Sequence, residues 1–581
     1  MSDNQRQRLR RARPVLALAA VSFLAGLIVG ANHGSSPSVS LATHFVTAWT
    51  KGDYAAMYAQ IAPASRREVS PSSFAGAYEA DMRVATAGRL RLAGRARPLG
   101  GGRIAVPVQV RTRLWGTLSL TYEIATVHTE DGERVAWTRS AAFPGVPAGQ
   151  ELTRRTSLPR RATLFARDGS VLAESDSDGA RSAPLGEVGR AVVGEVGQIP
   201  SSRRDELEAE GVPSDADVGV SGLERALDDR LRGMPGGELL AGSEVLASRP
   251  PKPAPAVHST VSPAIQQAAV TALGGQLGGV VAMTPGSGEV LAVAGLGLEG
   301  LQPPGSTFKI VTLSGALAAH IATPHTSFPY ATYATLDGVK LNNANGEDCG
   351  GSLELAFAVS CNSVFTPLGV KLGAARLVAM AEKFGFNHDP GLPGAARSTL
   401  PAASEIQGEL DVGSTAIGQG EVLATPLQML LVAATIADGG HRPAPSFLKG
   451  AARGGAQALS PSVARTVRHM MTEVVREGTG TSAAIPGVVV AGKTGTAELK
   501  SSCASSSEEQ EPHEPEQSEE SPSEGCQGGE SNPSNTDAWF TAFAPAVHPK
   551  IAVCVMLVKD GAGGDTAAPV ARAVLEQGLR G

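Results

Sequence analysis

Ser306 and Lys309 stand one helical turn apart, at the head of an apolar run, Ile310–His320, that predicts a helix. Side chains at i and i+3 share one helix face with Cβ atoms ~5–6 Å apart, so the lysine amine can reach the serine hydroxyl. The helix amino terminus also favours negative charge on the serine oxygen. The pair therefore has the pattern of a nucleophile and its base. A second pair, Ser446 and Lys449, lies among prolines and a glycine, and we interpret it as a coincidence in a loop.

Two more short motifs carry groups that can bind a peptide. Ser360-Cys-Asn362 ends an apolar stretch and offers a hydroxyl and an amide, which suit proton relay and the binding of a peptide carbonyl. Lys493-Thr-Gly-Thr496 follows the apolar run Val488–Ala491, which predicts an edge strand. A cation, two hydroxyls and a small residue suit a peptide that ends in a carboxylate. Each motif alone is also compatible with a turn, a cap or a strand end, and Ser2-Asp-Asn4 repeats the Ser-x-Asn pattern.

Length and composition limit the class of protein. The chain has 581 residues, which predicts several domains. It is 42% hydrophobic but only 4% aromatic, so its cores must consist mainly of Ala, Val and Leu. The net charge of −6 argues against nucleic acid as a partner. Residues 501–549 hold nine Glu and no Lys or Arg, so the rest of the chain is nearly neutral.

The amino terminus predicts a membrane anchor. Residues 1–13 contain five arginines and one aspartate, and an uncharged run follows from Val15 to Ala31. We expect a cytoplasmic tail at 1–13, a transmembrane anchor at 14–31 and an extracytoplasmic remainder, by the positive-inside rule. A cleaved signal peptide and a buried core helix are the alternatives. Chemistry outside the membrane has no ATP supply.

Helix and strand patterns divide the rest of the chain. Leu41–Ala59 predicts an amphipathic helix, and a proline-rich linker at 250–255 predicts a domain boundary. Asp168-Gly169 predicts the turn of a hairpin over 162–173. Further helices are expected at Ser262–Leu273, Leu427–Ala437 and Val463–Glu477, and strands at Ile104–Val110, Leu118–Ala125, Gly279–Thr284, Glu289–Gly295, Trp539–Ala544 and Ile551–Val558.

The five cysteines match no metal-site spacing, so we expect neither a zinc site nor a redox centre. In an oxidising exterior, two pairs are possible. Cys503 and Cys526 flank most of the acidic segment, and Cys349 and Cys361 lie beside Ser360. Either pair could instead stay reduced.

Ser-x-x-Lys, Ser-x-Asn and Lys-Thr-Gly in this order resemble the motif set of penicillin-binding proteins and serine β-lactamases. Residues 279–293, 384–386, 418–428 and 539–545 also resemble stretches of class B penicillin-binding proteins, which are peptidoglycan D,D-transpeptidases. Arg167-Asp-Gly and Gly222-Leu-Glu resemble the pedestal domain of that class. The segment before them resembles the nuclear-transport-factor-like domain of methicillin-resistance-type members.

The resemblance implies a multidomain α+β fold. A small cone-shaped α+β domain at 41–145 and an elongated pedestal or dimerisation domain at 150–250 would precede the transpeptidase domain at 256–581. The last would be an antiparallel sheet flanked by helices. The acidic Ser/Glu/Pro stretch at 501–535 departs from the family pattern, and because it has no apolar periodicity we expect a disordered insert near the rim of the site.

The resemblance also implies a role for each motif residue. Ser306 would be the acylated nucleophile, Lys309 its base and Ser360 the proton relay. Asn362 would hold the donor peptide, and the backbone N–H groups of Ser306 and Thr496 would form the oxyanion hole. The terminal carboxylate would bind at Lys493, Thr494, Gly495 and Thr496. No metal or organic cofactor is implied.

The implied partners are peptidoglycan stem peptides, β-lactams as substrate mimics, and a polytopic glycan polymerase. The motifs do not separate a transpeptidase from a D,D-carboxypeptidase or β-lactamase, in which water takes the acyl group. A sensor or scaffold that is acylated without turnover is a third possibility. The long amino-terminal domains favour a crosslinking enzyme, since a simple hydrolase needs none.

Overall fold

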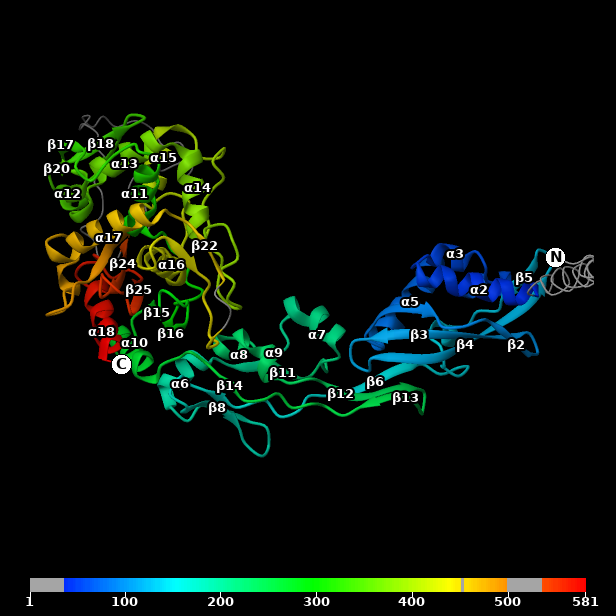
Figure 1. Ribbon diagram of the computed structural model, residues 1–581. Helices are drawn as coiled ribbons and strands as arrows, with labels where there is room; N and C mark the ends of the chain where they lie inside the picture. The colour runs from blue at the N-terminus through cyan, green and yellow to red at the C-terminus, as the bar shows by residue number, and fades with distance from the viewer. Residues whose placement is uncertain (1–35, 451–453, 499–534, 581) are drawn as a thin grey trace, which may run out of the picture. The chain divides into compact units, whose positions relative to one another are not determined.

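The computed structural model describes residues 36–450, 454–498 and 535–580 (Figure 1). The predicted tail and anchor, and the acidic insert apart from Asn535, lie outside these residues. The chain forms two compact units. The first contains the residues up to Pro159, Ile199–Ala216 and Met234–Lys252, and the second contains Arg160–Gln198, Asp217–Gly233 and the chain from Pro253 onward. The predicted segment at 150–250 thus contributes to both units.

The first unit contains an antiparallel sheet with helices on one face. Strand order is β1-β3-β4-β5, and β2 continues the β1 edge along β3. Alternate residues of β3 and β4 are buried, which places the apolar side of the sheet against the helices. The elements are α2 (Pro37–Thr50), α3 (Tyr54–Tyr58), α4 (Pro63–Glu68), α5 (Pro71–Val84), β1 (Ala87–Leu92), β2 (Arg97–Gly100), β3 (Arg103–Thr112), β4 (Thr117–Thr129) and β5 (Gly132–Val135).

The prediction of a single helix over Leu41–Ala59 was wrong, because two helices, α2 and α3, cover this stretch. α2 already starts at Pro37 and ends at Thr50. Gly52 then adopts a positive φ of 69°, which breaks the helix. The Asp53 carboxylate accepts a hydrogen bond from the Ala56 amide at 2.9 Å and starts α3. A second sheet of this unit, β13-β12-β6, comprises β6 (Leu152–Ser157), β12 (Gly236–Ala241) and β13 (Glu244–Arg249).

The second unit begins with short strands around a buried ionic cluster. The predicted hairpin is present as β7 (Leu164–Phe165) and β8 (Val171–Ser175), paired antiparallel. Glu224, in α8 (Gly222–Ala226), is fully buried, and its two carboxylate oxygens accept from Arg161 at 2.5 Å and Arg181 at 2.6 Å. The other elements here are β9 (Arg181–Ser182), α6 (Gly186–Val193), β10 (Val196–Gln198), β11 (Asp217–Gly219), α9 (Asp228–Leu231) and β14 (Val257–His258).

A five-stranded antiparallel sheet of order β16-β15-β25-β24-β23 forms the centre of the second unit. Its strands are β15 (Gly278–Met283), β16 (Val290–Gly295), β23 (Ala491–Glu498), β24 (Thr536–Ala544) and β25 (Ile551–Leu557). Helices α10 (Pro263–Leu273) and α18 (Ala567–Arg580) cover one face, where Val280, Val553 and Val574 pack together.

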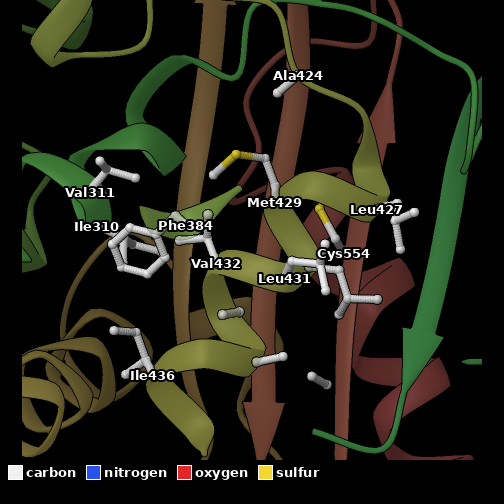
Figure 2. Close-up of a cluster of buried hydrophobic side chains, with 14 of the residues drawn as sticks. Ile310, Val311, Phe384, Ala424, Leu427, Met429, Leu431, Val432, Ile436 and Cys554 are labelled. Carbon is white, nitrogen blue, oxygen red and sulfur yellow. The ribbon is translucent and has the colours of Figure 1, made fainter. Parts of the chain in front are cut away.

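The other face of the sheet packs on α16 (Pro426–Ala437), which is buried along its whole length. Figure 2 shows Met429, Leu431 and Val432 of this helix between Cys554 of the sheet and Phe384. The remaining helices are α11 (Lys309–Ala318), α12 (Leu353–Ala358), α13 (Asn362–Leu372), α14 (Ala374–Phe384), α15 (Gly408–Ala416) and α17 (Pro461–Arg476). The expected multidomain α+β class, with a helix-flanked antiparallel sheet, is confirmed.

Two local predictions differ from the structure. The apolar residues Val488–Val490 are not part of the sheet, and β23 starts only at Ala491. The turn that contains Ser306 is a 3-10 turn, Gly305–Phe308, and the α-helix starts at Lys309.

Within the three described stretches, no single helix is long and apolar enough to cross a membrane, although the bent pair α13 and α14 meets those criteria jointly.

Candidate active site

The segment that carries Ser306 is fixed by close backbone packing. Gly305 has a positive φ of 52°, and its amide donates to the Gly418 carbonyl at 3.0 Å. A Cβ at Gly305 would lie 2.6 Å from the Thr496 carbonyl oxygen, so only glycine allows this contact with β23. Ser306 is half-buried at the surface of the 3-10 turn, whereas Lys309 is fully buried at the start of α11.

Ser360 and Asn362 lie in the turn between α12 and α13. Ser360 has a φ of +61°, which is rare for a residue with a side chain and characteristic of functional turns. Cys361 is joined by a disulfide to Cys349 of β20 (Cys349–Ser352), so one of the two possible pairings is present. The Asn343 side chain also accepts from the Ser363 amide at 2.7 Å. These contacts fix the turn from two sides.

Three sequence-distant motifs meet at the Ser360 hydroxyl. The Lys493 ammonium donates to the Ser360 Oγ at 2.9 Å, and the Lys309 amine lies 3.3 Å from the same oxygen. Lys309 also donates to the Ser360 carbonyl and to the Asn362 Oδ1, both at 2.6 Å. The contact with Asn362 adds a role to the expected one, which was to hold the donor peptide. Its amide oxygen holds Lys309, and its Nδ2 donates to the Asn342 carbonyl at 2.9 Å.

The site contains two buried amines side by side. Lys309 and Lys493 are both fully buried, and each amine lies over a phenylalanine ring, Phe365 at 5.6 Å and Phe357 at 5.5 Å. The pKa of Lys493 lies well below its ordinary value, mainly because burial disfavours the charged amine and to a smaller extent because Lys309 repels it. The Ser360 hydroxyl therefore lies next to two buried amines, which is a suitable environment for proton transfer.

The Lys-Thr-Gly motif lies inside β23, the edge strand of the sheet. A Cβ at Gly495 would lie 2.8 Å from the Pro304 carbonyl oxygen and 3.0 Å from the Thr307 methyl. This close approach holds the Ser306 segment against the strand. Together with the contact between Gly305 and Thr496, it packs together the two segments that carry the predicted oxyanion donors, Ser306 and Thr496.

Sequence reasoning missed Thr479. Its hydroxyl lies 2.5 Å from the Thr494 hydroxyl, and its amide donates to the Ala358 carbonyl at 3.1 Å. Thr479 therefore connects the Lys-Thr-Gly strand to the end of α12, two residues before Ser360. The signal in the sequence is Gly478-Thr-Gly480, in which Thr479 lies fourteen residues before Lys493, and this pattern alone predicts no binding role.

Other candidates lie outside the site. Ser446 and Lys449 occupy a loop, as predicted, and the Ser446 hydroxyl donates to the Leu448 carbonyl at 3.3 Å. Cys554 is a buried thiol in β25, while Cys503 and Cys526 lie outside the described residues. Across the described ranges, no group of three or more His, Cys, Asp or Glu is arranged to hold a metal ion.

Comparison with known families agrees with this geometry. The family described as "Penicillin binding protein transpeptidase domain" matches residues 278–576, which is more than half of the chain. The chain belongs to the penicillin-binding protein transpeptidase family. Its earlier residues match a penicillin-binding protein dimerisation domain at 171–243 and an NTF2-like N-terminal transpeptidase domain at 38–150. The resemblance to class B members with an NTF2-like front domain is thus confirmed.

The named relatives of this penicillin-binding protein include two mycobacterial proteins. The chain is 34% identical to the peptidoglycan D,D-transpeptidase PbpA of Mycobacterium tuberculosis over 393 residues, which is 56% of this chain and 72% of that protein. It is 33% identical to PbpA of Mycolicibacterium smegmatis, over 62% and 80% of the two chains. The crystal structure of the M. tuberculosis protein superposes with a TM-score of 0.55 at 28% identity, covering 72% and 99%. That protein also forms an imipenem acyl-enzyme complex.

Proposed function

We propose that this penicillin-binding protein is a D,D-transpeptidase that crosslinks peptidoglycan stem peptides through an acyl-enzyme at Ser306. The observation that carries the proposal is the meeting of Lys309, Lys493 and Ser360 at one hydroxyl, next to the Ser306 segment. The named relatives are peptidoglycan D,D-transpeptidases, and one of them is acylated by β-lactams.

Acylation starts with the transfer of the Ser306 hydroxyl proton to Lys309. This step requires an unprotonated amine. A neutral amine has two N–H bonds, which suffice for the Ser360 carbonyl and the Asn362 amide oxygen, and its lone pair can take the proton. The Ser306 oxygen then attacks the carbonyl between the two terminal D-alanines. The amides of Ser306 and Thr496 bind the negative oxygen that develops, and each such donor is worth ~10²–10³ in rate.

Collapse of the tetrahedral intermediate breaks the peptide bond and releases D-alanine. Its nitrogen receives a proton through Ser360, which lies between both lysines. Lys493 and the Thr494 hydroxyl, with Gly495 and Thr496, bind the carboxylate of the donor peptide before it leaves. The amine of a second stem peptide then attacks the ester, loses a proton to the same relay, and regenerates the serine. β-Lactams acylate Ser306 by opening their ring.

The second part of the proposal concerns location. Residues 14–31 anchor the chain in the cell membrane as a single pass, the tail at 1–13 is cytoplasmic, and the three domains at 41–145, 150–250 and 256–581 are extracytoplasmic. The partner in the membrane is a polytopic glycan polymerase, which supplies uncrosslinked strands. Support for this part comes from the arginines and the apolar run in the sequence.

A labelling experiment with a matched control tests the acyl-enzyme. Fluorescent penicillin should label the full-length chain, and the label should disappear in Ser306→Ala. Ser446→Ala removes the serine of the second Ser-x-x-Lys motif and should label like the wild type. Label retained in Ser306→Ala would refute the assignment of the nucleophile.

The fate of the acyl group separates the three activities. A labelled donor pentapeptide is mixed with the chain and with an excess of an acceptor stem peptide. We expect a crosslinked product whose yield rises with the acceptor concentration. Release of a tetrapeptide alone would show a carboxypeptidase, and a stable acyl-enzyme without product would show a sensor or scaffold.

A further inference from the structure

The outer face of the first sheet carries five arginines. Arg89 and Arg91 of β1 and Arg97 of β2 lie along one edge, next to Arg103 and Arg111 of β3. All five are exposed. The side chains of Ile104, Val106, Val108 and Val110 of β3 point to the opposite face and are buried in the core under the helices. We call these five side chains the arginine face.

The charge of this face is not balanced locally. Residues 82–122 contain eight arginines and no Asp, Glu or Lys. Arg89 lies directly opposite Arg111 across the strand pair, an arrangement of like charges that destabilises a sheet. Among the described residues, only Arg103 of the five has a carboxylate partner, Glu123 at 3.4 Å, and both side chains are more than half exposed. A binding role for an anionic partner accounts for a charge pattern that costs stability.

The shape of the face indicates a broad partner. The neighbouring strand β4 adds the short, exposed side chains of Thr117, Ser119 and Thr121, which lie opposite Arg111, Gln109 and Pro107. Three adjacent strands therefore present a wide surface of guanidinium and hydroxyl groups. The helices α2 and α5 lie on the other side of this sheet (Figure 1). Guanidinium groups bind phosphate oxygens with paired hydrogen bonds.

The position of the face in the chain indicates where this partner lies. The Ser38 hydroxyl, at the start of α2, donates to Glu133 of β5 at 3.2 Å. The Thr126 amide of β4 donates to the Gly102 carbonyl, in the turn between β2 and β3, at 2.6 Å. The start of α2 is therefore at the same end of the sheet as Arg103. Only residues 32–36 separate α2 from the proposed anchor, and five residues span at most ~17 Å.

We propose that the arginine face docks on the phosphate groups of an anionic phospholipid surface. The inference rests on the proposed membrane attachment and not on the acyl-transfer chemistry. Each arginine near such a surface strengthens attachment by about fivefold, and salt screens the effect. Glu130 and Asp131 form the turn between β4 and β5 and disfavour an approach by that tip. The flat face, rather than the end of the sheet, thus meets the lipid.

Arginine modification in vesicles tests the proposal on the full-length chain. The chain is reconstituted in vesicles of phosphatidylcholine, with or without one-third phosphatidylglycerol, and treated with phenylglyoxal before mass spectrometry. With phosphatidylglycerol, we expect modification of Arg89, Arg91 and Arg111 to fall by about fivefold or more, and high salt to restore it. The exposed Arg397 of the second unit is the internal reference and should not change.

Two triple variants separate the face from general charge. In R89Q/R91Q/R111Q, lipid protection of the remaining Arg97 and Arg103 should be lost. The matched control, R67Q/R83Q/R155Q, removes three exposed arginines from α4, α5 and β6 and should keep that protection.

Several results would overturn the proposal. They are equal modification in both kinds of vesicle, loss of protection in both variants, and protection by soluble poly(glycerol phosphate) in neutral vesicles without protection by phosphatidylglycerol. A chain that does not float with the vesicles would overturn the anchor and this inference together. Floating chains with unprotected arginines would overturn the inference alone. Penicillin labelling of Ser306 in the same samples reports separately on the proposed chemistry.

Discussion

Substitution of Gly495 by alanine should inactivate the site without unfolding the protein. The added Cβ would lie 2.8 Å from the Pro304 carbonyl oxygen and 3.0 Å from the Cγ2 of Thr307 and the Cβ of Trp539. Ordinary contacts lie at about 3.5 Å, so β23 and the Ser306 segment must separate by about 0.5 Å. Overpacking of this size costs ~1–3 kcal/mol of stability. Oxyanion donors must lie ~2.7–3.1 Å from the reacting oxygen, so the shift removes about one donor and lowers acylation by ~10²–10³.

The assay is the rate of acylation by fluorescent penicillin, followed with the melting temperature of the same sample. Gly76→Ala, in α5, is the matched control, because its Cβ would meet nothing within 4 Å. The control should acylate at the wild-type rate. The reasoning is wrong if Gly495→Ala acylates within about threefold of the wild type, since the loss of one donor costs far more. It is also wrong if the variant loses activity only because it no longer folds.

Three further predictions concern charge and covalent links. The first concerns the free energy of unfolding, measured with denaturant at several pH values. It should increase as pH rises from the lowered pKa of Lys493 in the folded protein towards the pKa of ~10.4 in the unfolded chain, by at most ~1.4 kcal/mol per pH unit. The reason is that in this range the unfolded chain binds a proton at Lys493 that the folded protein does not. Lys493→Met should have a shallower slope than the wild type, and equal slopes would contradict the lowered pKa of Lys493. The second is Glu224→Gln, which removes the carboxylate that pairs with the buried guanidinium groups of Arg161 and Arg181. The free energy of unfolding should fall by ~3–5 kcal/mol, measured as a lower melting temperature, and the variant should still be acylated by penicillin at temperatures where it is folded. The double variant C349S/C361S should lose at most about 3 kcal/mol, because the disulfide closes a loop of only 12 residues; no change in stability would argue that the thiols are reduced in the purified chain.

Local sequence patterns predicted the elements well, because helix and strand periodicity is a local property. The helix that starts at Pro426, the hairpin at Asp168-Gly169 and the strand at Ile551 each follow from neighbouring residues. The strand prediction for Val488–Val490 was wrong because a short apolar run does not distinguish a strand from another apolar segment. The exact start of an edge strand depends on its partner strand, and the pairing of β23 with β24 begins at Ala491, opposite Phe543.

The long-range contacts of the site were accessible only through the resemblance to a family. Lys493 and Ser360 are 133 residues apart, and nothing in either motif specifies a distance between them. Thr479 was missed for the same reason, since its contact with Thr494 depends on how the loop after α17 folds back. The role of Asn362 towards Lys309 was also missed, because a Ser-x-Asn pattern is compatible with several directions of the amide.

The backbone at Ser360 explains why one residue can serve two lysines. A left-handed conformation costs a residue with a side chain roughly 1–2 kcal/mol, which glycine would avoid. Here it turns both the carbonyl oxygen and the hydroxyl of Ser360 towards Lys309, at 2.6 and 3.3 Å, while the hydroxyl still accepts from Lys493. Glycine would relax the turn but remove the hydroxyl that contacts both amines. The strained backbone thus holds the contacts that the proposed proton relay requires, and the adjoining disulfide at Cys361 helps to hold the turn.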